Sequence, residues 1–203
     1  NLNKEKINNK LVIMAGGKGK RLYKFTKNTP KPMLKINGKP ILEKIIERAI
    51  IQGIDNYIIT TGYLGKKILN YFGNGRKKNI KIDYINENKP LGTAGSFFYL
   101  KSEKNDLLVT NADLLTEINY LQLLNFHKKH KSDFTVVIKK LDWAFPYGSI
   151  KYKNFRLSEL QEKPKMKFEI IAGVYVIKPK VLEVLKKPIF TEITDLIQKL
   201  IKL

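Results

Sequence analysis

The chain of 203 residues contains no cysteine, two histidines and one tryptophan. The absence of cysteine excludes disulfides, thiolate metal sites and a cysteine nucleophile. No apolar run reaches the roughly 18 residues that a membrane-spanning helix requires, so we expect no membrane partner. The first ten residues are polar and basic and lack the apolar stretch of a secretory signal. We therefore expect a cytoplasmic protein.

Acidic residues are also scarce, since 18 Asp and Glu stand against 39 Lys and Arg and the formal net charge is +21. The lysines are scattered and accompanied by frequent Asn and Ile, which is typical of an AT-rich coding bias spread over solvated faces. No motif that combines aromatic and basic residues supports a nucleic-acid partner, and we expect none. Some of the cations can instead serve phosphorylated substrates.

Segments of strand character alternate with helical patterns along most of the chain. The predicted strands are residues 11–15, 57–61, 80–85, 106–110 and 134–139, and the predicted helices are residues 41–50, 64–72, 94–101 and 120–130. This alternation predicts an α/β fold with a mostly parallel sheet and helices on both faces. Beyond residue 141 we expect an α+β part, with strands at 148–152, 155–160 and 170–177 and helices at 181–185 and 192–203.

Three polar loops follow predicted strands, at the edge where ligands bind to an open parallel sheet. They are Gly16-Gly17-Lys18-Gly19-Lys20-Arg21-Leu22, then Glu87-Asn88-Lys89-Pro90-Leu91-Gly92-Thr93-Ala94-Gly95, then Asn111-Ala112-Asp113. Glycines that expose backbone N–H groups, together with basic side chains, suit a polyphosphate. The first loop is neither a Walker A loop nor a dinucleotide fingerprint, because no Gly-Lys-Ser/Thr opens a helix and Leu22 replaces the third glycine.

Lys31 lies between Pro30 and Pro32, and this gives it a restricted backbone. One interpretation is that Lys31 is a preorganised cation that binds an anionic substrate. A rigid loop with an incidental lysine is the other.

Taken in order, seven segments resemble the sugar-1-phosphate nucleotidyltransferase family, over about residues 10 to 200. They are Met14 to Leu22, Pro30-Lys31-Pro32-Met33, Leu91 to Gly95, Asn111-Ala112-Asp113, Pro146-Tyr147-Gly148, Glu162-Lys163-Pro164 and Ala172-Gly173. The resemblance implies a Rossmann-like three-layer α/β/α sandwich. It also implies a nucleotide-binding part at about residues 10–140 and a small α+β sugar-binding part at about residues 141–203.

The resemblance implies an activity that joins a nucleoside triphosphate to a sugar 1-phosphate and releases pyrophosphate. Its catalytic residues would be Arg21, Lys31, Asp113 and Lys163, with Asp113 also the ligand of Mg²⁺. The nucleotide would contact Met14, Ala15, Gly16, Gly17, Lys18, Gly19, Glu87, Leu91, Gly92 and Thr93. The sugar would contact Gly148, Glu162 and Gly173.

In-line attack by a phosphate needs no strong base, because a phosphate monoester has its second pKa near ~6 and is mostly a dianion at neutral pH. No Ser-His-Asp or Cys-His arrangement stands out. His127 and His130 belong to a Lys-rich helix end, where we expect solvated side chains or an interaction with the helix dipole.

Glu87 favours GTP, because a carboxylate only accepts hydrogen bonds and guanine offers two adjacent donors where uracil and thymine offer one. The fuller pattern resembles bacterial members with N-terminal CBS domains, several of which are guanylyltransferases for hexosamine or heptose 1-phosphates in surface-glycan and legionaminic-type pathways. The preferred reaction is GTP plus glucosamine 1-phosphate giving GDP-glucosamine. Uridylyl or thymidylyl transfer, or mannose or heptose 1-phosphate as the sugar, are the alternatives.

Two departures from the family pattern bear on activity. Ile171 stands where relatives often have Asn, which removes a polar sugar contact. The family's C-terminal Trp-x-Asp-x-Gly-like segment, whose Asp is a second metal ligand, does not occur, and we expect a fragment of a longer chain. A non-catalytic nucleotide-binding regulatory domain is a further alternative, and self-association into a homo-oligomer stays open.

Overall fold

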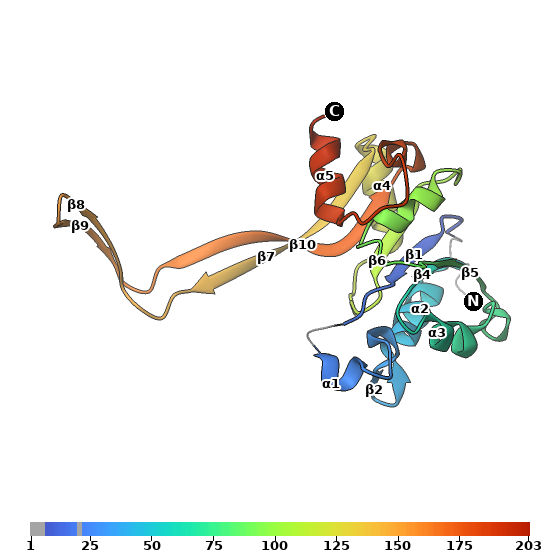
Figure 1. The fold of residues 1–203 in the computed structure, drawn as a ribbon. Coiled ribbons are helices and arrows are strands. Elements are labelled where there is room, and N and C mark those ends of the chain that lie inside the picture. The colour runs from blue at the N-terminus through green and yellow to red at the C-terminus, as the bar shows by residue number, and fades with distance from the viewer. Residues whose placement is uncertain (1–6, 20–21) are drawn as a thin grey trace. The chain divides into compact units, whose positions relative to one another are not determined.

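A six-stranded sheet in the order β5-β4-β1-β6-β10-β7 forms the centre of the computed structural model, which describes residues 7–19 and 22–203 (Figure 1). The strands are β1 (Leu11–Ala15), β4 (Asn56–Thr61), β5 (Lys81–Asn86), β6 (Leu107–Asn111), β7 (Phe134–Ala144) and β10 (Lys165–Ile177). Strands β5, β4, β1 and β6 run parallel, and β10 pairs antiparallel with β6. The predicted α/β fold with a mostly parallel sheet is confirmed.

Helices flank this sheet. The α-helices are α1 (Tyr23–Thr26), α2 (Ile41–Ile51), α3 (Gly65–Phe72), α4 (Tyr120–Lys129) and α5 (Ile193–Ile201). The 3₁₀ helices are η2 (Lys31–Met33), η3 (Arg76–Lys78), η4 (Gly95–Leu100) and η5 (Pro179–Val184). The helices expected at residues 94–101 and 181–185 are the 3₁₀ helices η4 and η5.

The core lies around β1, whose sequence is a continuous apolar run. Leu11, Val12 and Ile13 are fully buried, as expected of a parallel strand covered on both faces. The α2 helix supplies a matching apolar stripe of Ile41, Leu42, Ile45, Ile46 and Ala49. This packing holds the carboxyl end of β1, where the Gly16–Gly19 segment begins.

Short strands β2 (Lys35–Ile36) and β3 (Lys39–Pro40) form a hairpin ahead of α2. Asn37 and Gly38 at its turn have φ of 52° and 80°. An Asn-Gly pair tolerates these positive values, which explains the tight turn. This hairpin was not among the predicted strands, although an Asn-Gly pair is a signal for a β-turn.

The chain divides into two compact units, one formed by Asn1–Thr135 with Gly173–Leu203 and the other by Val136–Ala172. The first unit holds the buried core described above. The second contains the antiparallel hairpin of β8 (Ser149–Lys153) and β9 (Arg156–Gln161), whose side chains are all exposed. Where the structure describes the chain, no helix is long and apolar enough to cross a bilayer.

The expectation that His127 is solvated is wrong. Its side chain is fully buried, and Nδ1 lies 2.7 Å from the Thr135 hydroxyl. Nε2 has no hydrogen-bond partner and lies 3.7 Å from the Asp106 carboxylate. Burial lowers the pKa of His127, so its neutral form is favoured. The neighbouring lysines suggested a solvated position, but His127 lies on the core-facing side of α4.

Candidate functional site

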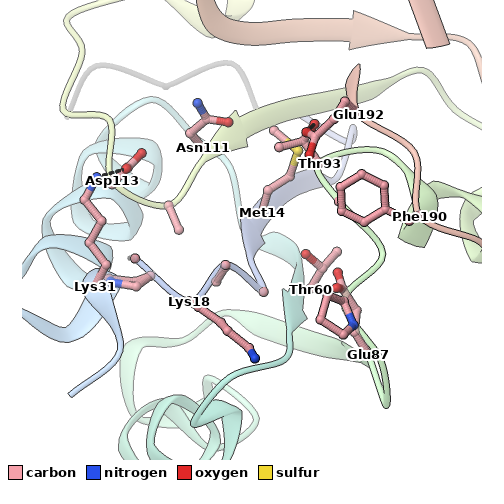
Figure 2. A pocket seen from close by; sticks show the side chains of 18 of the residues that line it. Met14, Lys18, Lys31, Thr60, Glu87, Thr93, Asn111, Asp113, Phe190 and Glu192 are labelled. Carbon is pink, nitrogen blue, oxygen red and sulfur yellow. Dashed lines mark hydrogen bonds and ion pairs between the residues drawn. The ribbon is translucent and has the colours of Figure 1, made fainter. Parts of the chain in front are cut away.

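A cavity of about 570 Å³ opens at the carboxyl ends of the parallel strands (Figure 2). All three polar loops that the sequence singled out contribute to its lining. The lining residues are Met14, Ala15, Gly16, Gly17, Lys18, Gly19, Leu22, Lys31, Pro32, Thr60, Glu87, Pro90, Gly92, Thr93, Asn111, Ala112, Asp113, Phe190 and Glu192. The prediction that these loops share one rim is confirmed. A volume of this size suits a small organic ligand.

The loop after β1 is wedged between two neighbouring segments at Gly16. A Cβ added there would lie 2.9 Å from the Glu87 carboxyl group, and one added at Gly62 would lie 2.9 Å from the Gly16 carbonyl oxygen. The contact at Gly62 is with backbone and requires glycine, whereas the Glu87 carboxyl group is the end of a flexible side chain. Lys18 is exposed and lines the cavity, whereas Arg21 lies outside the residues that the structure describes.

Lys31 and Asp113 form an ion pair across one side of the cavity (Figure 2). Pro30 has φ −61° and ψ 143°, and Lys31 then begins the short η2 helix. This geometry agrees with a backbone constrained by the flanking prolines. The two side chains are 30% and 35% exposed, so their charges are reachable by a ligand. Their direct contact could not be foreseen, since 82 residues separate them in sequence.

The family that the motifs resemble generally uses a divalent metal ion. The donor groups near Asp113 therefore decide whether the predicted Mg²⁺ is plausible at this cavity. Among the residues described, no group of three or more His, Cys, Asp or Glu side chains could hold a metal ion. Mg²⁺ usually keeps several waters and takes one or two carboxylates together with substrate phosphates. The single Asp113 carboxylate at this cavity is compatible with that coordination.

Glu87 directly follows β5, lines the cavity and is held by hydrogen bonds to neighbouring backbone. Its backbone N–H donates to the Thr61 carbonyl (2.7 Å), and its Oε2 accepts the Leu91 N–H (3.2 Å). Burial raises the pKa of this carboxyl, while hydrogen bonds from Leu91 and Ser96 partly oppose the rise. The carboxylate is therefore held in place with acceptor capacity remaining.

Leu91 differs from the other residues predicted to contact the nucleotide. Its side chain is buried, and it is not among the residues that line the cavity. Its backbone carbonyl instead accepts the Thr191 N–H at 2.9 Å. Leu91 holds the loop that carries Gly92 and Thr93, both of which line the cavity.

Three lining residues lie outside the loops and motifs that the sequence indicated. Thr60 is the next-to-last residue of β4, while Phe190 and Glu192 come from the segment before α5. That segment lies about one hundred residues from the loop it meets, and no local pattern announces the contact. Glu192 does carry one signal, since it forms a capping box with Asp195 at the start of α5.

The predicted sugar-contacting residues fall in both units. Gly173 belongs to the sheet-bearing unit, and with φ +80° a Cβ there would lie 2.5 Å from the Asn111 side chain, which lines the cavity. Gly148, Glu162 and Lys163 belong to the unit Val136–Ala172. Within that unit a Cβ on Gly148 would lie 3.2 Å from the Glu162 carboxylate, so the two residues are neighbours.

The chain is similar to several known proteins. The family model described as "Nucleotidyl transferase" matches residues 10–202. The bifunctional protein GlmU of Methanococcus vannielii is 36% identical over 207 residues, covering 94% of this chain and 47% of that protein. The chain thus spans about half the length of this relative.

Two further similar proteins are a guanylyltransferase and a protein whose crystal structure contains GMP-PN. The D-glycero-alpha-D-manno-heptose 1-phosphate guanylyltransferase of Aneurinibacillus thermoaerophilus is 33% identical over 175 residues, which cover 85% of this chain and 76% of that protein. The crystal structure of HddC from Yersinia pseudotuberculosis complexed with GMP-PN superposes with a TM-score of 0.70 and 28% identity, covering 90% of this chain and 82% of that one.

Proposed function

This chain belongs to the nucleotidyl transferase family, and from that premise we propose that it joins a nucleoside triphosphate to a sugar 1-phosphate and releases pyrophosphate. The preferred substrates are GTP and glucosamine 1-phosphate, which give GDP-glucosamine. The observation that carries this proposal is the single cavity in which the Gly16 loop, the Lys31–Asp113 pair and Glu87 meet. These groups offer phosphate-binding backbone, charge and a hydrogen-bond acceptor within one ligand-sized space.

Guanine is preferred because of the chemistry of Glu87. A carboxylate accepts hydrogen bonds only, and the N1–H and N2–H₂ groups of guanine are two adjacent donors. The heptose 1-phosphate guanylyltransferase and the GMP-PN complex of HddC, as relatives, support the same base. The likeness of the motifs to members with N-terminal CBS domains supports a role in a surface-glycan or legionaminic-type pathway.

The reaction needs alignment and charge neutralisation more than proton abstraction. The sugar phosphate is largely a dianion at neutral pH and attacks the α-phosphorus in line with the departing pyrophosphate. Backbone N–H groups of the Gly16–Gly19 segment would bind phosphate oxygens, and Lys31 would stabilise charge on the transferring group. Arg21, by its position in the same loop, would bind the departing pyrophosphate.

Asp113 is the residue that would hold Mg²⁺. The ion, when bound, supplies Lewis-acid stabilisation of phosphate oxygens. Asp113 contributes one carboxylate, which suits an ion otherwise held by phosphates and water. Lys31 must then share Asp113 with the metal or turn its ammonium group toward the phosphates, and its partial exposure leaves room for either arrangement.

The remaining predicted residues are assigned to the sugar 1-phosphate. Lys163 would bind the phosphate of the sugar, and Glu162 would accept hydrogen bonds from sugar hydroxyl groups. Gly148 and Gly173 would let the backbone approach the sugar ring. The neighbouring positions of Gly148 and Glu162, and of Gly173 and Asn111, support these assignments.

A pyrophosphate-release screen tests the proposal by crossing GTP, ATP, UTP and dTTP with glucosamine, mannose, glucose and heptose 1-phosphates. We expect the highest kcat/KM with GTP and glucosamine 1-phosphate and no release without a divalent cation. Faster turnover of UTP or dTTP with every sugar phosphate would overturn the guanine assignment. Lys10→Ala serves as a control for loss of surface charge, because its partner Glu103 lies away from this cavity.

A further inference from the structure

Phe190 is a large apolar side chain that the proposed chemistry leaves without a role. It lines the cavity, yet it is 61% exposed. Figure 2 shows its ring on the same side of the cavity as Glu87, with the Lys31–Asp113 pair on the opposite side. The Lys31–Asp113 ion pair thus lies on one side of the cavity, and an exposed aromatic face lies on the other.

The segment that carries Phe190, residues 189–192, is called here the strap. Its backbone is held against the Gly92 loop, residues 90–95, by two hydrogen bonds. The Thr191 N–H donates to the Leu91 carbonyl, and the Ala94 N–H donates to the Thr191 carbonyl, both at 2.9 Å. The strap and the Gly92 loop thus form one paired element at the rim of the cavity.

Two glycines make this pairing close. A Cβ on Gly92 would lie 2.5 Å from the Thr191 carbonyl oxygen, and a Cβ on Gly95 would lie 2.2 Å from the Ile189 carbonyl oxygen. Both distances are far below van der Waals contact, so the Gly92 loop accepts the strap only because these positions lack a side chain. The position of Phe190 follows from this fit.

Side chains strengthen the same contact. The Thr93 hydroxyl donates to the Glu192 carboxylate (2.8 Å) and accepts the Ile193 N–H (2.6 Å), which joins the Gly92 loop to the strap and to the first residue of α5. The backbone at Phe190, held between the Gly92 loop and the start of α5, loses little further freedom when a ligand binds. Preorganisation of this kind favours affinity.

The chemistry of Phe190 and Glu87 fits a nucleobase. A planar base stacks on an aromatic ring, which contributes about 1–3 kcal/mol per base. A carboxylate accepts N–H donors at the edge of such a base. Thr60 and Pro90, which line the same cavity, limit the remaining space around it. Phosphate groups and a hydrated metal ion gain little from an exposed phenyl face.

We propose that Phe190 is a base-stacking residue that helps determine nucleotide specificity, with the strap supplying one wall of a slot whose edge is read by Glu87. This inference rests on the proposed function, since it requires a nucleotide in the cavity. It adds a determinant from the segment before α5 to the three loops found from the sequence. Purines, with the larger π surface, gain more from this wall than pyrimidines.

Equilibrium binding measurements distinguish the contribution of the base to affinity from that of the phosphates. Dissociation constants of GTP, UTP and inorganic tripolyphosphate are measured by calorimetry for the wild-type chain, Phe190→Ala and Phe190→Trp. We expect Phe190→Ala to weaken GTP binding about 5-fold to 150-fold, the range that stacking energies imply. Its affinity for tripolyphosphate should stay within about 2-fold, the ratio of GTP to UTP affinity should fall, and Phe190→Trp should keep tight GTP binding.

Phe126→Ala is the matched control, because Phe126 is 52% exposed on α4 and does not line the cavity. The inference is wrong if Phe190→Ala binds GTP as the wild type does. It is also wrong if GTP and tripolyphosphate weaken equally, since that pattern indicates a general effect on the fold. A wild-type chain that binds tripolyphosphate but no nucleotide overturns the proposed function itself, so the two failures are distinguishable.

Discussion

The pairing of the strap with the Gly92 loop predicts that Gly92→Ala destabilises the protein much more than Gly38→Ala. Both glycines have positive φ, +73° and +80°, so alanine experiences similar backbone strain at either position. A Cβ at Gly38 would meet nothing within 4 Å, whereas one at Gly92 would lie 2.5 Å from the Thr191 carbonyl oxygen. The difference between the two variants isolates the contact with the strap.

The magnitude follows from the displacement that the added methyl group requires. Left-handed φ costs an alanine about 1–2 kcal/mol, partly offset by about 0.4–1 kcal/mol from the stiffer unfolded chain, and these contributions are common to both variants. To reach the 3.0 Å below which real Cβ contacts are essentially absent, the carbonyl must retreat by about 0.5 Å. That displacement lengthens the 2.9 Å bond from the Ala94 N–H beyond a normal hydrogen-bond distance.

Losing this bond, and disturbing the one from Thr191 to Leu91, adds about 1–3 kcal/mol at Gly92. Urea denaturation followed by circular dichroism measures the free energy of unfolding of both variants. We expect Gly92→Ala to be lower than Gly38→Ala by that amount, and its Tm to be lower by several degrees, since ~1 kcal/mol shifts Tm by about 2–4 °C at this chain length. Equal stabilities, within about 0.5 kcal/mol, would refute the described fit between strap and loop.

Three further variants test other parts of the structure. Asp113→Asn should lower kcat at least about 100-fold while changing the unfolding free energy by no more than about 1 kcal/mol, because its ion pair is partly exposed; activity and denaturation assays check this together. The pKa of Glu87 is raised in the folded state, so its protonated form stabilises the fold at pH values below the ordinary pKa of 4.5, and this stabilisation is lost as pH rises through the folded-state pKa. Glu87→Gln should therefore remove the extra unfolding free energy at acid pH, which a series of denaturation curves at different pH values measures. Thr135→Val should cost about 1–3 kcal/mol, measured by denaturant titration, because it leaves the buried His127 ring without its hydrogen bond.

Most of the fold could be predicted from local patterns. The apolar run at β1 and the amphipathic spacing of α2 have strong periodicity, and their bounds agree with the structure to within one residue. The 3₁₀ helices were less predictable, because six-residue apolar segments satisfy several helical spacings. The burial of His127 depended on which face of α4 meets the core, and flanking lysines gave the opposite indication.

The candidate site could be predicted where residues follow strands directly. Topology alone brings the ends of β1, β5 and β6 to one rim, so Lys18, Glu87 and Asp113 were accessible to sequence reasoning. Phe190 and Glu192 were not, because their contact with the Gly92 loop joins segments about one hundred residues apart. No local pattern encodes a long-range backbone pairing between a loop and a helix start.

The central claim is attack of a sugar phosphate on the α-phosphorus of GTP, and isotope transfer tests it most directly. The chain is incubated with Mg²⁺, glucosamine 1-phosphate and GTP that carries ³²P at either the α or the γ position, and the products are separated by chromatography. We expect α-label in a sugar nucleotide and γ-label in pyrophosphate. Transfer of the γ-label to the sugar phosphate, or its release as inorganic phosphate with no labelled sugar nucleotide, would contradict it.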